Sequence, residues 1–293
     1  MDIESKKFLG QPKNFVSIFN ALLFDGQPVL KPEYLKDENS ELVMNVSSKH
    51  VDIIKRYEDG TYLDLFVIES QSYVDPSMVA RVMEYESVAR MRYIRQNFKK
   101  HVPMHTRLPM ILTVVLYVGE SKWNAAKRLS ELEIIHPGFE DMFNEFKLNL
   151  IELNTNHKYN TGEKATQDFF DLLRMIYRKQ ILKEDLDREF NRDALYFAYV
   201  VTKNKELLNI YQESENGDVK VCRALDEMFE ESTNKGSQMG IKQGIEQGVA
   251  SGVKNTQIKI AIKMLVRNNQ TLEEISEIVG LDLDALRELK KSI

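Results

Sequence analysis

The sequence predicts a mixed α/β (α+β) fold in which helices flank a sheet and a helical C-terminal half follows. Two β-rich segments flank the pair Asp59-Gly60, and a run of branched apolar residues follows Pro109. Segments with helical spacing lie before, between and after these strands. Strands mixed with helices in this order are typical of an α/β or α+β core.

The composition is that of a globular protein with one sizeable core. At 293 residues and 43% hydrophobic content, the chain can form one large domain with an appendage. Charged residues make up 29% of the chain, and nothing resembles the apolar-poor composition of a disordered protein. The net charge of −5 excludes a surface that is basic throughout, so binding of nucleic acid would need a local patch.

The single cysteine and the start of the chain predict a reducing, cytoplasmic setting. Cys222 has no second cysteine with which to form an internal disulfide. Residues 1–10 lack the apolar stretch of a signal peptide. The longest apolar run, at 110–118, is about half of what a membrane span requires, so we expect no membrane insertion.

The elements of the N-terminal half follow from turn residues and apolar patterns. An Asp-Gly pair between two β-rich runs is a strong signal for a hairpin with a two-residue turn. The run at 110–118 lacks polar alternation, which predicts a strand covered on both faces and therefore helices on both sides of the sheet. In order, we expect a buried helix at 14–24, strands at 50–57 and 61–70, a helix at 76–99 and a strand at 110–118.

The C-terminal half is predicted to be mostly helical. Thr271 with Glu274 forms a capping box that begins a helix ending near Gly280. The other expected elements are helices at 123–132, 163–182, 188–213, 218–231, 256–267 and 281–290 and a strand at 146–153. We divide the chain into a core at 1–155, a helical extension at 156–233, a glycine-repeat segment at 234–255 and a small helical tail module at 256–293.

Five glycines recur every four residues between positions 236 and 252. Four residues advance a helix by about 40° more than one turn, so these glycines would form a slow spiral along it. Each would cost about 1 kcal/mol relative to alanine. The nearby charges of Lys242 and Glu246 exclude a lipid setting. Two interpretations stay open: a flexible or loosely helical tether, and a self-association helix that forms a homo-oligomer.

Two acidic residues of the predicted hairpin can meet on one face of the sheet. A two-residue turn pairs Asp52 with Val67, and Glu69 is then the diagonal neighbour of Asp52, at about 7–8 Å between backbones. Because side chains alternate along a strand, Gln71 shares this face and Asp64 lies on the other. Two carboxylates at this separation can hold one Mg²⁺, which prefers oxygen ligands.

Glu69 ends an apolar strand, where a buried charge requires a partner. A metal ion would provide the positive charge. An arginine such as Arg81 or Arg90 would do so equally well, and the hairpin alone leaves both interpretations open.

The candidate residues stand in an ordered set of motifs: Asp52, Glu69 with Gln71, Pro76 with Met78, Arg81, Tyr85, and Val115-Leu116-Tyr117 with Gly119. This order resembles the recombination-promoting nucleases, a transposase family that carries a PD-(D/E)XK nuclease domain. The resemblance covers about residues 14–132 well, the following helices loosely, and also the glycine-repeat tail. Each motif is weak by itself, but their ordered combination is fairly specific.

The resemblance implies a restriction-endonuclease-like core that cleaves DNA with Mg²⁺ held by Asp52 and Glu69. The wider nuclease superfamily has lysine where this chain has Gln71, which can orient water but carries no charge. Ser70 stands where the family often has histidine. The expected function is a Mg²⁺-dependent DNA endonuclease that supports recombination or transposition. The alternative is a catalytically inactive nuclease fold that binds DNA or a protein partner.

A basic segment directly follows the candidate site. Residues 81–107 contain seven arginines and lysines against two glutamates. Helical spacing places Arg81, Tyr85, Arg92 and Arg95 on one face, which with the nuclease hypothesis predicts a ridge that contacts DNA phosphates. The competing interpretation is a solvated helix face whose arginines form salt bridges with Glu84 and Glu86.

Overall fold

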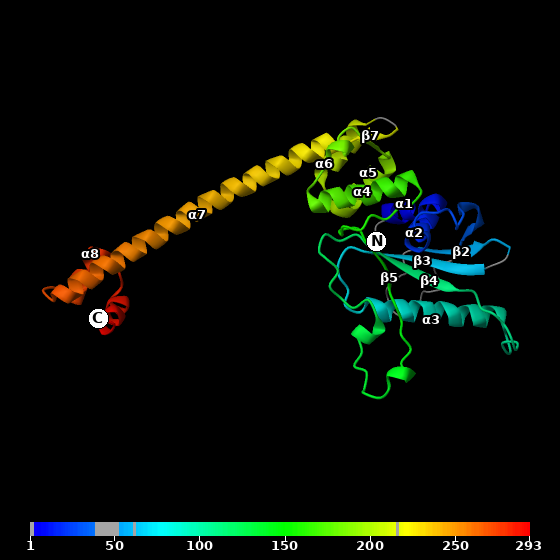
Figure 1. Ribbon diagram of the computed structural model, residues 1–293, viewed down its shortest axis with the longest axis horizontal. Coiled ribbons are helices and arrows are strands. Elements are labelled where there is room, and N and C mark those ends of the chain that lie inside the picture. The colour runs from blue at the N-terminus through cyan, green and yellow to red at the C-terminus, as the bar shows by residue number, and fades with distance from the viewer. Residues whose placement is uncertain (1–2, 39–52, 61–62, 215–216) are drawn as a thin grey trace. The chain divides into compact units, whose positions relative to one another are not determined.

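The computed structural model of the chain describes residues 3–38, 53–60, 63–214 and 217–293 (Figure 1). These residues fall into two compact units, Met1–Asp226 and Glu227–Ile293. The first unit contains the sheet, and the second is helical.

Five strands form one mixed sheet in the order β1-β2-β3-β4-β5, and the mixed sheet confirms the predicted fold class. The first three strands are antiparallel neighbours, whereas β3, β4 and β5 run parallel to one another. The bounds are β1 (Leu35–Asp37), β2 (Ile53–Glu58), β3 (Leu63–Gln71), β4 (Ile111–Tyr117) and β5 (Asn149–Glu152).

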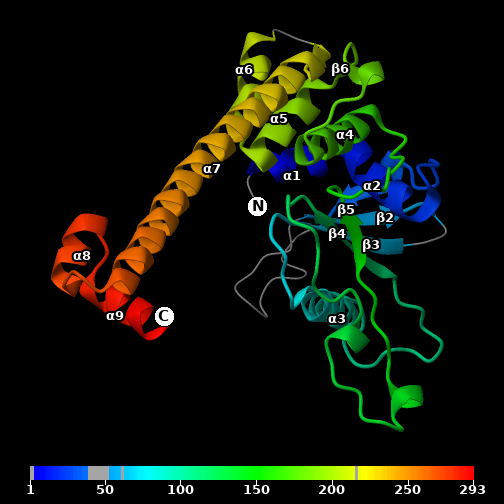
Figure 2. The ribbon, with the colours of Figure 1, turned by 60° about the vertical axis from the view of Figure 1, so that its left-hand side comes forward.

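Helices cover both faces of the sheet, and Figures 1 and 2 show α3 on one face and α2 on the other. On the α3 face, Val82 packs in one apolar cluster with Val115 of β4. On the opposite face, the ring of Phe19 lies 4.8 Å from that of Phe66. Val114 and Val115, which alternate between the faces, are both fully buried. The prediction that β4 is covered on both faces is therefore confirmed.

The turn of the β2–β3 hairpin differs from the prediction. Ile54 pairs with Val67 and Glu58 pairs with Leu63, whereas the two-residue turn would pair Glu58 with Thr61. The expected pairing is shifted by two positions. A shift of two leaves every side chain on its predicted face because the side-chain period of a strand is also two.

The predicted helix at 123–132 is wrong, because the described chain is irregular there apart from one short turn at Leu129–Glu131. The indole of Trp123 packs against the ring of Tyr117 at 5.1 Å and donates to the carbonyl of Ala125. Arg128 then forms an antiparallel bridge with Lys147. These contacts replace the helix that the apolar spacing of this segment suggested.

The helix expected at 188–213 is divided into two helices with a short strand before them. Lys203 adopts a left-handed φ of 56° and ends the first helix, and the side chain of Asn204 caps the second through the amide of Glu206. The elements of this region are α4 (Lys164–Arg178), β6 (Glu189–Phe190), α5 (Arg192–Thr202), α6 (Lys205–Glu213) and β7 (Val219–Lys220). Strand β7 pairs with β6 and replaces the start of the helix predicted at 218–231.

The remaining elements of the first unit pack around these helices. Phe8 lies against Phe169 and Phe197 and so joins α1 to α4 and α5. Their bounds are α1 (Ile3–Leu9), α2 (Pro12–Phe24), α3 (Met78–Asn97), and the short 3-10 turns η1 (Pro32–Tyr34), η3 (Leu129–Glu131), η4 (Glu140–Met142) and η5 (Lys183–Asp185).

The glycine repeat lies within a single helix of 46 residues, α7 (Cys222–Arg267). The predicted capping box of Thr271 and Glu274 is present at the start of α8 (Leu272–Val279), and α9 (Leu283–Lys291) follows. These helices bury a small core made of Ala261, Leu265, Ile275, Val279 and Leu286. None of the described helices combines the length and the apolar composition that a membrane span requires.

Glu86 is a buried carboxylate on α3, away from the candidate site. The amide of Thr113 donates to its Oε1 at 3.0 Å, and Arg90 lies 3.8 Å from its Oε2. Burial raises the pKa of the Glu86 carboxyl above its ordinary value, and these contacts only partly offset that effect.

We expect Glu86→Gln to raise the melting temperature at pH 7 by a few degrees. A raised pKa gives the folded chain a stability advantage that is complete below the ordinary pKa of an unfolded glutamate and is lost as pH rises through the folded pKa. Glutamine does not ionise, so it avoids this loss of stability, and its amide oxygen can still accept the hydrogen bond from the amide of Thr113. Melting curves of both proteins at pH 4 and pH 7 measure the effect. A variant that is less stable at pH 7 would contradict it.

Candidate functional site

Glu69 and Gln71 lie on one face at the end of β3, as their spacing predicts. Both side chains are buried, with 2% and 5% of their residue surface exposed. The Gln71 amide Nε2 donates to Glu69 Oε1 at 2.8 Å. Two polar side chains on the same face at the end of an apolar strand are thus hydrogen-bonded to each other beneath α3.

Arg81 provides a positive charge beside the buried carboxylate of Glu69. Its Nη2 lies 3.0 Å from Glu69 Oε1. The sequence left a metal ion and an arginine open as partners for Glu69, and the described arrangement contains the arginine. Arg90, the other candidate, pairs instead with Glu86.

Asp75 is a member of the site that the sequence analysis missed. Its Oδ2 lies 2.5 Å from Arg81 Nη1, while its Oδ1 accepts from the amide and the hydroxyl of Ser77 at 2.9 and 2.7 Å. Burial raises the pKa of the Asp75 carboxyl, but the hydrogen bonds from Ser77 and Arg81 outweigh it and hold this pKa below its ordinary value. The signal that could have found it is an aspartate two residues before a serine at a helix start, which is typical of a local turn.

Tyr85 completes the surroundings of the guanidinium. Its hydroxyl accepts from Arg81 Nε at 3.1 Å and from Nη2 at 2.7 Å. Burial lowers the pKa of Arg81, but its hydrogen bonds to Tyr85 and Asp75 and the charge of Glu69 outweigh this and raise the pKa. Arg81 is therefore a charged arginine, held at three of its nitrogen atoms, with 14% of its side chain exposed.

A glycine shapes the end of the neighbouring strand. A side chain at Gly119 would place its Cβ 2.6 Å from the carbonyl oxygen of Ser72 and 2.5 Å from the hydroxyl of Tyr117. Only glycine allows these two segments to approach so closely, which explains this residue in the Val-Leu-Tyr-X-Gly motif. The close contact fixes the backbone directly after Gln71.

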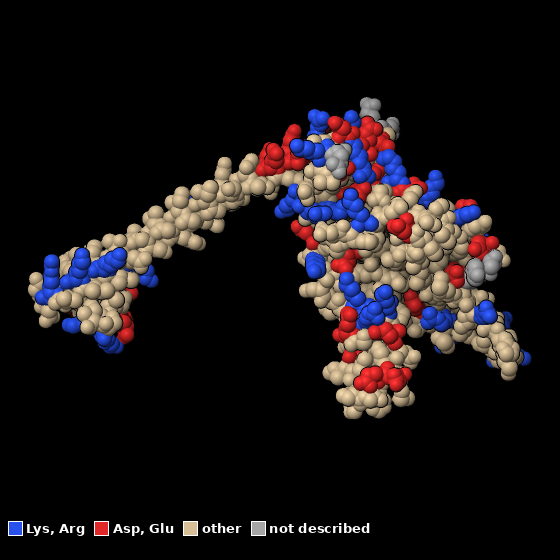
Figure 3. Space-filling view, in the orientation of Figure 1, with Lys and Arg blue, Asp and Glu red and all other residues tan. Residues whose placement is uncertain are grey.

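The other predicted site residues are placed differently. Asp52 lies outside the described residues. Arg81 and Tyr85 lie beside Glu69, whereas Arg92 is half-buried and Arg95 is exposed, and the contact of these four residues with DNA phosphates stays a prediction. Among the described residues on the face drawn in Figure 3, basic side chains are interspersed with acidic ones.

The donor atoms at the end of β3 suit a hard divalent cation. Glu69 brings a carboxylate and Gln71 an amide oxygen, both of which are ligand types that Mg²⁺ accepts. Within the described ranges, no three histidine, cysteine, aspartate or glutamate side chains are grouped to hold a metal ion. A metal here would therefore need Glu69 together with further oxygen ligands, such as water, DNA phosphate or Asp52.

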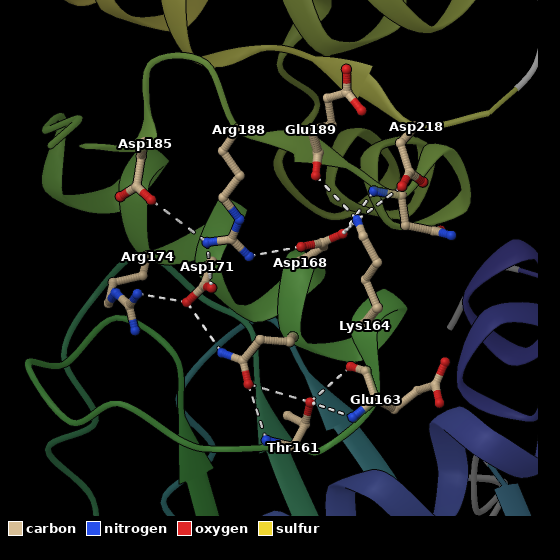
Figure 4. Close-up of polar contacts among 12 residues, drawn as sticks. Thr161, Glu163, Lys164, Asp168, Asp171, Arg174, Asp185, Arg188, Glu189 and Asp218 are labelled. Atoms are coloured by element: carbon tan, nitrogen blue, oxygen red, sulfur yellow. Dashed lines mark hydrogen bonds and ion pairs between the residues drawn. The ribbon is translucent and has the colours of Figure 1, made fainter. Parts of the chain in front are cut away.

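A second buried acidic cluster lies on α4 and is held by basic side chains (Figure 4). Arg188 contacts Asp168 at 2.7 Å and Asp171 at 2.9 Å. Lys164 also contacts Asp168, and Arg174 contacts Asp171. These ion pairs join α4 to the segment before α5, so we interpret the cluster as structural.

Comparison with known proteins identifies one related family. A family model described as "Putative transposase, YhgA-like" matches residues 33–207, which include every described residue of the site at the end of β3. Searches among curated proteins and among solved structures found no match.

Proposed function

Because the chain belongs to the family described as "Putative transposase, YhgA-like", we propose that it is a Mg²⁺-dependent DNA endonuclease that supports transposition or recombination. One observation carries the proposal. A buried glutamate at the end of a sheet strand is bonded to Gln71, two residues further along the same strand. The recombination-promoting nucleases, which this chain resembles, have a Glu-X-Gln motif here, and the resemblance implies that its glutamate is a metal ligand.

In the proposed reaction, the carboxylates of Glu69 and Asp52 would hold the cation. The role of Asp52 is inferred from the sequence alone. Asp52 directly precedes Ile53, and Ile53 pairs with Ile68, the residue directly before Glu69 along the strand. When bound, Mg²⁺ activates water and stabilises the charge that builds up on the phosphate. Gln71 orients the attacking water through its amide, and its hydrogen bond to Glu69 fixes the carboxylate.

The DNA backbone is proposed to contact the exposed basic residues that follow the site. Arg95, Lys99, Lys100 and Arg107 are exposed, and the segment 95–107 contains no acidic residue. Contacts of this kind position DNA without reading its sequence, and they make binding weaken with salt.

Plasmid cleavage tests the proposed function directly. The purified full chain is incubated with supercoiled plasmid in Mg²⁺, with EDTA as the control, and nicked and linear products are measured. We expect nicking that requires the metal. Salt-sensitive DNA binding without cleavage in Mg²⁺ or Mn²⁺ would instead support an inactive nuclease fold that binds DNA, an alternative favoured by the absence of a lysine at position 71.

A further inference from the structure

Arg81 is shared between two carboxylates that come from different elements. Glu69 lies on β3, Asp75 lies in the connection that follows it, and Arg81 lies in the first turns of α3. The distances are 3.0 Å from Nη2 to Glu69 and 2.5 Å from Nη1 to Asp75. The side chains of the two acids are 3% and 11% exposed, so water screens these charges weakly.

The guanidinium of Arg81 has two anchors besides Glu69: Asp75, which binds Nη1, and the hydroxyl of Tyr85. Asp75 is itself fixed by two hydrogen bonds from Ser77, and the Tyr85 hydroxyl accepts from Nε and Nη2 of Arg81. Without its contact to Glu69, Arg81 would keep an ionic partner and a hydroxyl partner. Arg81 can therefore give up its contact to Glu69 without losing all its partners, provided that a cation replaces it beside this buried carboxylate.

We propose that Arg81 is the resident counter-ion of Glu69 and competes with a divalent cation for this carboxylate, while Asp75 binds the other end of the guanidinium and so weakens its hold on Glu69. The inference rests on the proposed function, because it requires Glu69 to bind metal. A guanidinium and a metal ion repel each other when both lie beside one buried carboxylate. Arg81 thus lowers the affinity of the site for metal, and Asp75 limits that effect.

The proposal predicts opposite effects for two neighbouring substitutions. Arg81→Met removes the competing charge and should tighten Mn²⁺ binding by about tenfold. Asp75→Asn removes the charge that attracts Arg81 from the other side, so Arg81 binds Glu69 more strongly and Mn²⁺ binding should weaken by a few fold. A purely structural role for the cluster would predict weaker binding in both variants.

A double variant separates a direct effect of Asp75 from an effect through Arg81. In Arg81→Met/Asp75→Asn, Mn²⁺ should bind as tightly as in Arg81→Met alone, because Asp75 then has no arginine to position. If binding in the double variant fell back to the wild-type affinity, Asp75 would be a metal ligand, and its proposed positioning role would be overturned.

The experiment is calorimetric titration of the DNA-free full chain with Mn²⁺, with a melting curve of each variant in EDTA to establish folding. Arg90→Met is the matched control, since Arg90 lies on the same helix and pairs with Glu86 instead. It should bind Mn²⁺ as the wild type does. If Arg81→Met does not fold, Arg81→Gln removes the same charge, keeps hydrogen-bonding groups for Tyr85 and Asp75, and should show the same tightening.

The outcomes separate this inference from the proposed function. Wild-type binding that is lost in Glu69→Gln, together with unchanged or weaker binding in Arg81→Met, would overturn the competition and leave the metal site intact. Absence of Mn²⁺ binding in wild type and in every variant would overturn the proposed metal site, and the competition with it.

Discussion

Replacing Glu69 by glutamine should abolish Mg²⁺-dependent nicking of plasmid DNA, with a loss of about 1000-fold or more in rate. The amide has nearly the shape of the carboxylate and can still accept from Gln71 and Arg81, so the local structure should persist. What it lacks is the negative charge that holds the cation. The rate of loss of supercoiled plasmid measures the effect, and a melting curve checks the fold.

Glu86→Gln is the matched control for this substitution. It makes the same chemical change at another buried glutamate of the first unit, whose partners are Thr113 and Arg90. Its cleavage rate should equal that of the wild type. Equal cleavage by wild type and Glu69→Gln would show a contaminating nuclease or a misplaced site. Asp52→Asn should match Glu69→Gln, as the sequence predicts for the second ligand.

Gln71→Leu should reduce cleavage by about 100-fold or more, the second-largest effect that we expect. Leucine can neither orient a water molecule nor donate to Glu69, and it would leave that buried carboxylate with one donor fewer. Gln71→Lys should retain or increase cleavage, because lysine keeps a donor at this position and restores the charge that the wider nuclease superfamily has there.

The two variants at position 71 are compared by nicking rate at several Mg²⁺ concentrations and by DNA binding at two salt concentrations. Full activity in Gln71→Leu would exclude the role assigned to this side chain. If wild type and both variants are inactive while salt-sensitive DNA binding persists, the chain is an inactive nuclease fold that binds DNA.

The local pattern of the sequence was sufficient for the elements whose signals are short-ranged. The branched run before Tyr117 predicted a strand buried on both faces, and Thr271 with Glu274 predicted the capped start of a helix. Hydrogen bonds and side-chain periods of a few residues decide such features. The same period placed Glu69 and Gln71 on one face even though the observed register is shifted by two residues from the predicted one.

Features that depend on distant partners needed the tertiary structure. The apolar spacing around Trp123 suggested a helix. The contact between the Trp123 and Tyr117 rings accompanies an irregular backbone there instead. The hairpin left a metal ion and an arginine equally suited to Glu69, and the packing of α3 against β3 brings Arg81 to it.

The sequence by itself therefore determined the mixed fold class, the strand that carries the site and the face on which Glu69 and Gln71 meet, because these follow from periods of a few residues. Only the tertiary structure decided the surroundings of that site. Asp75 joins it because a loop and a helix place its carboxylate against the guanidinium of Arg81, at 2.5 Å. Once these groups are buried, the energy of each charge depends on the charged and polar groups around it. Such a dependence arises only when the chain has folded.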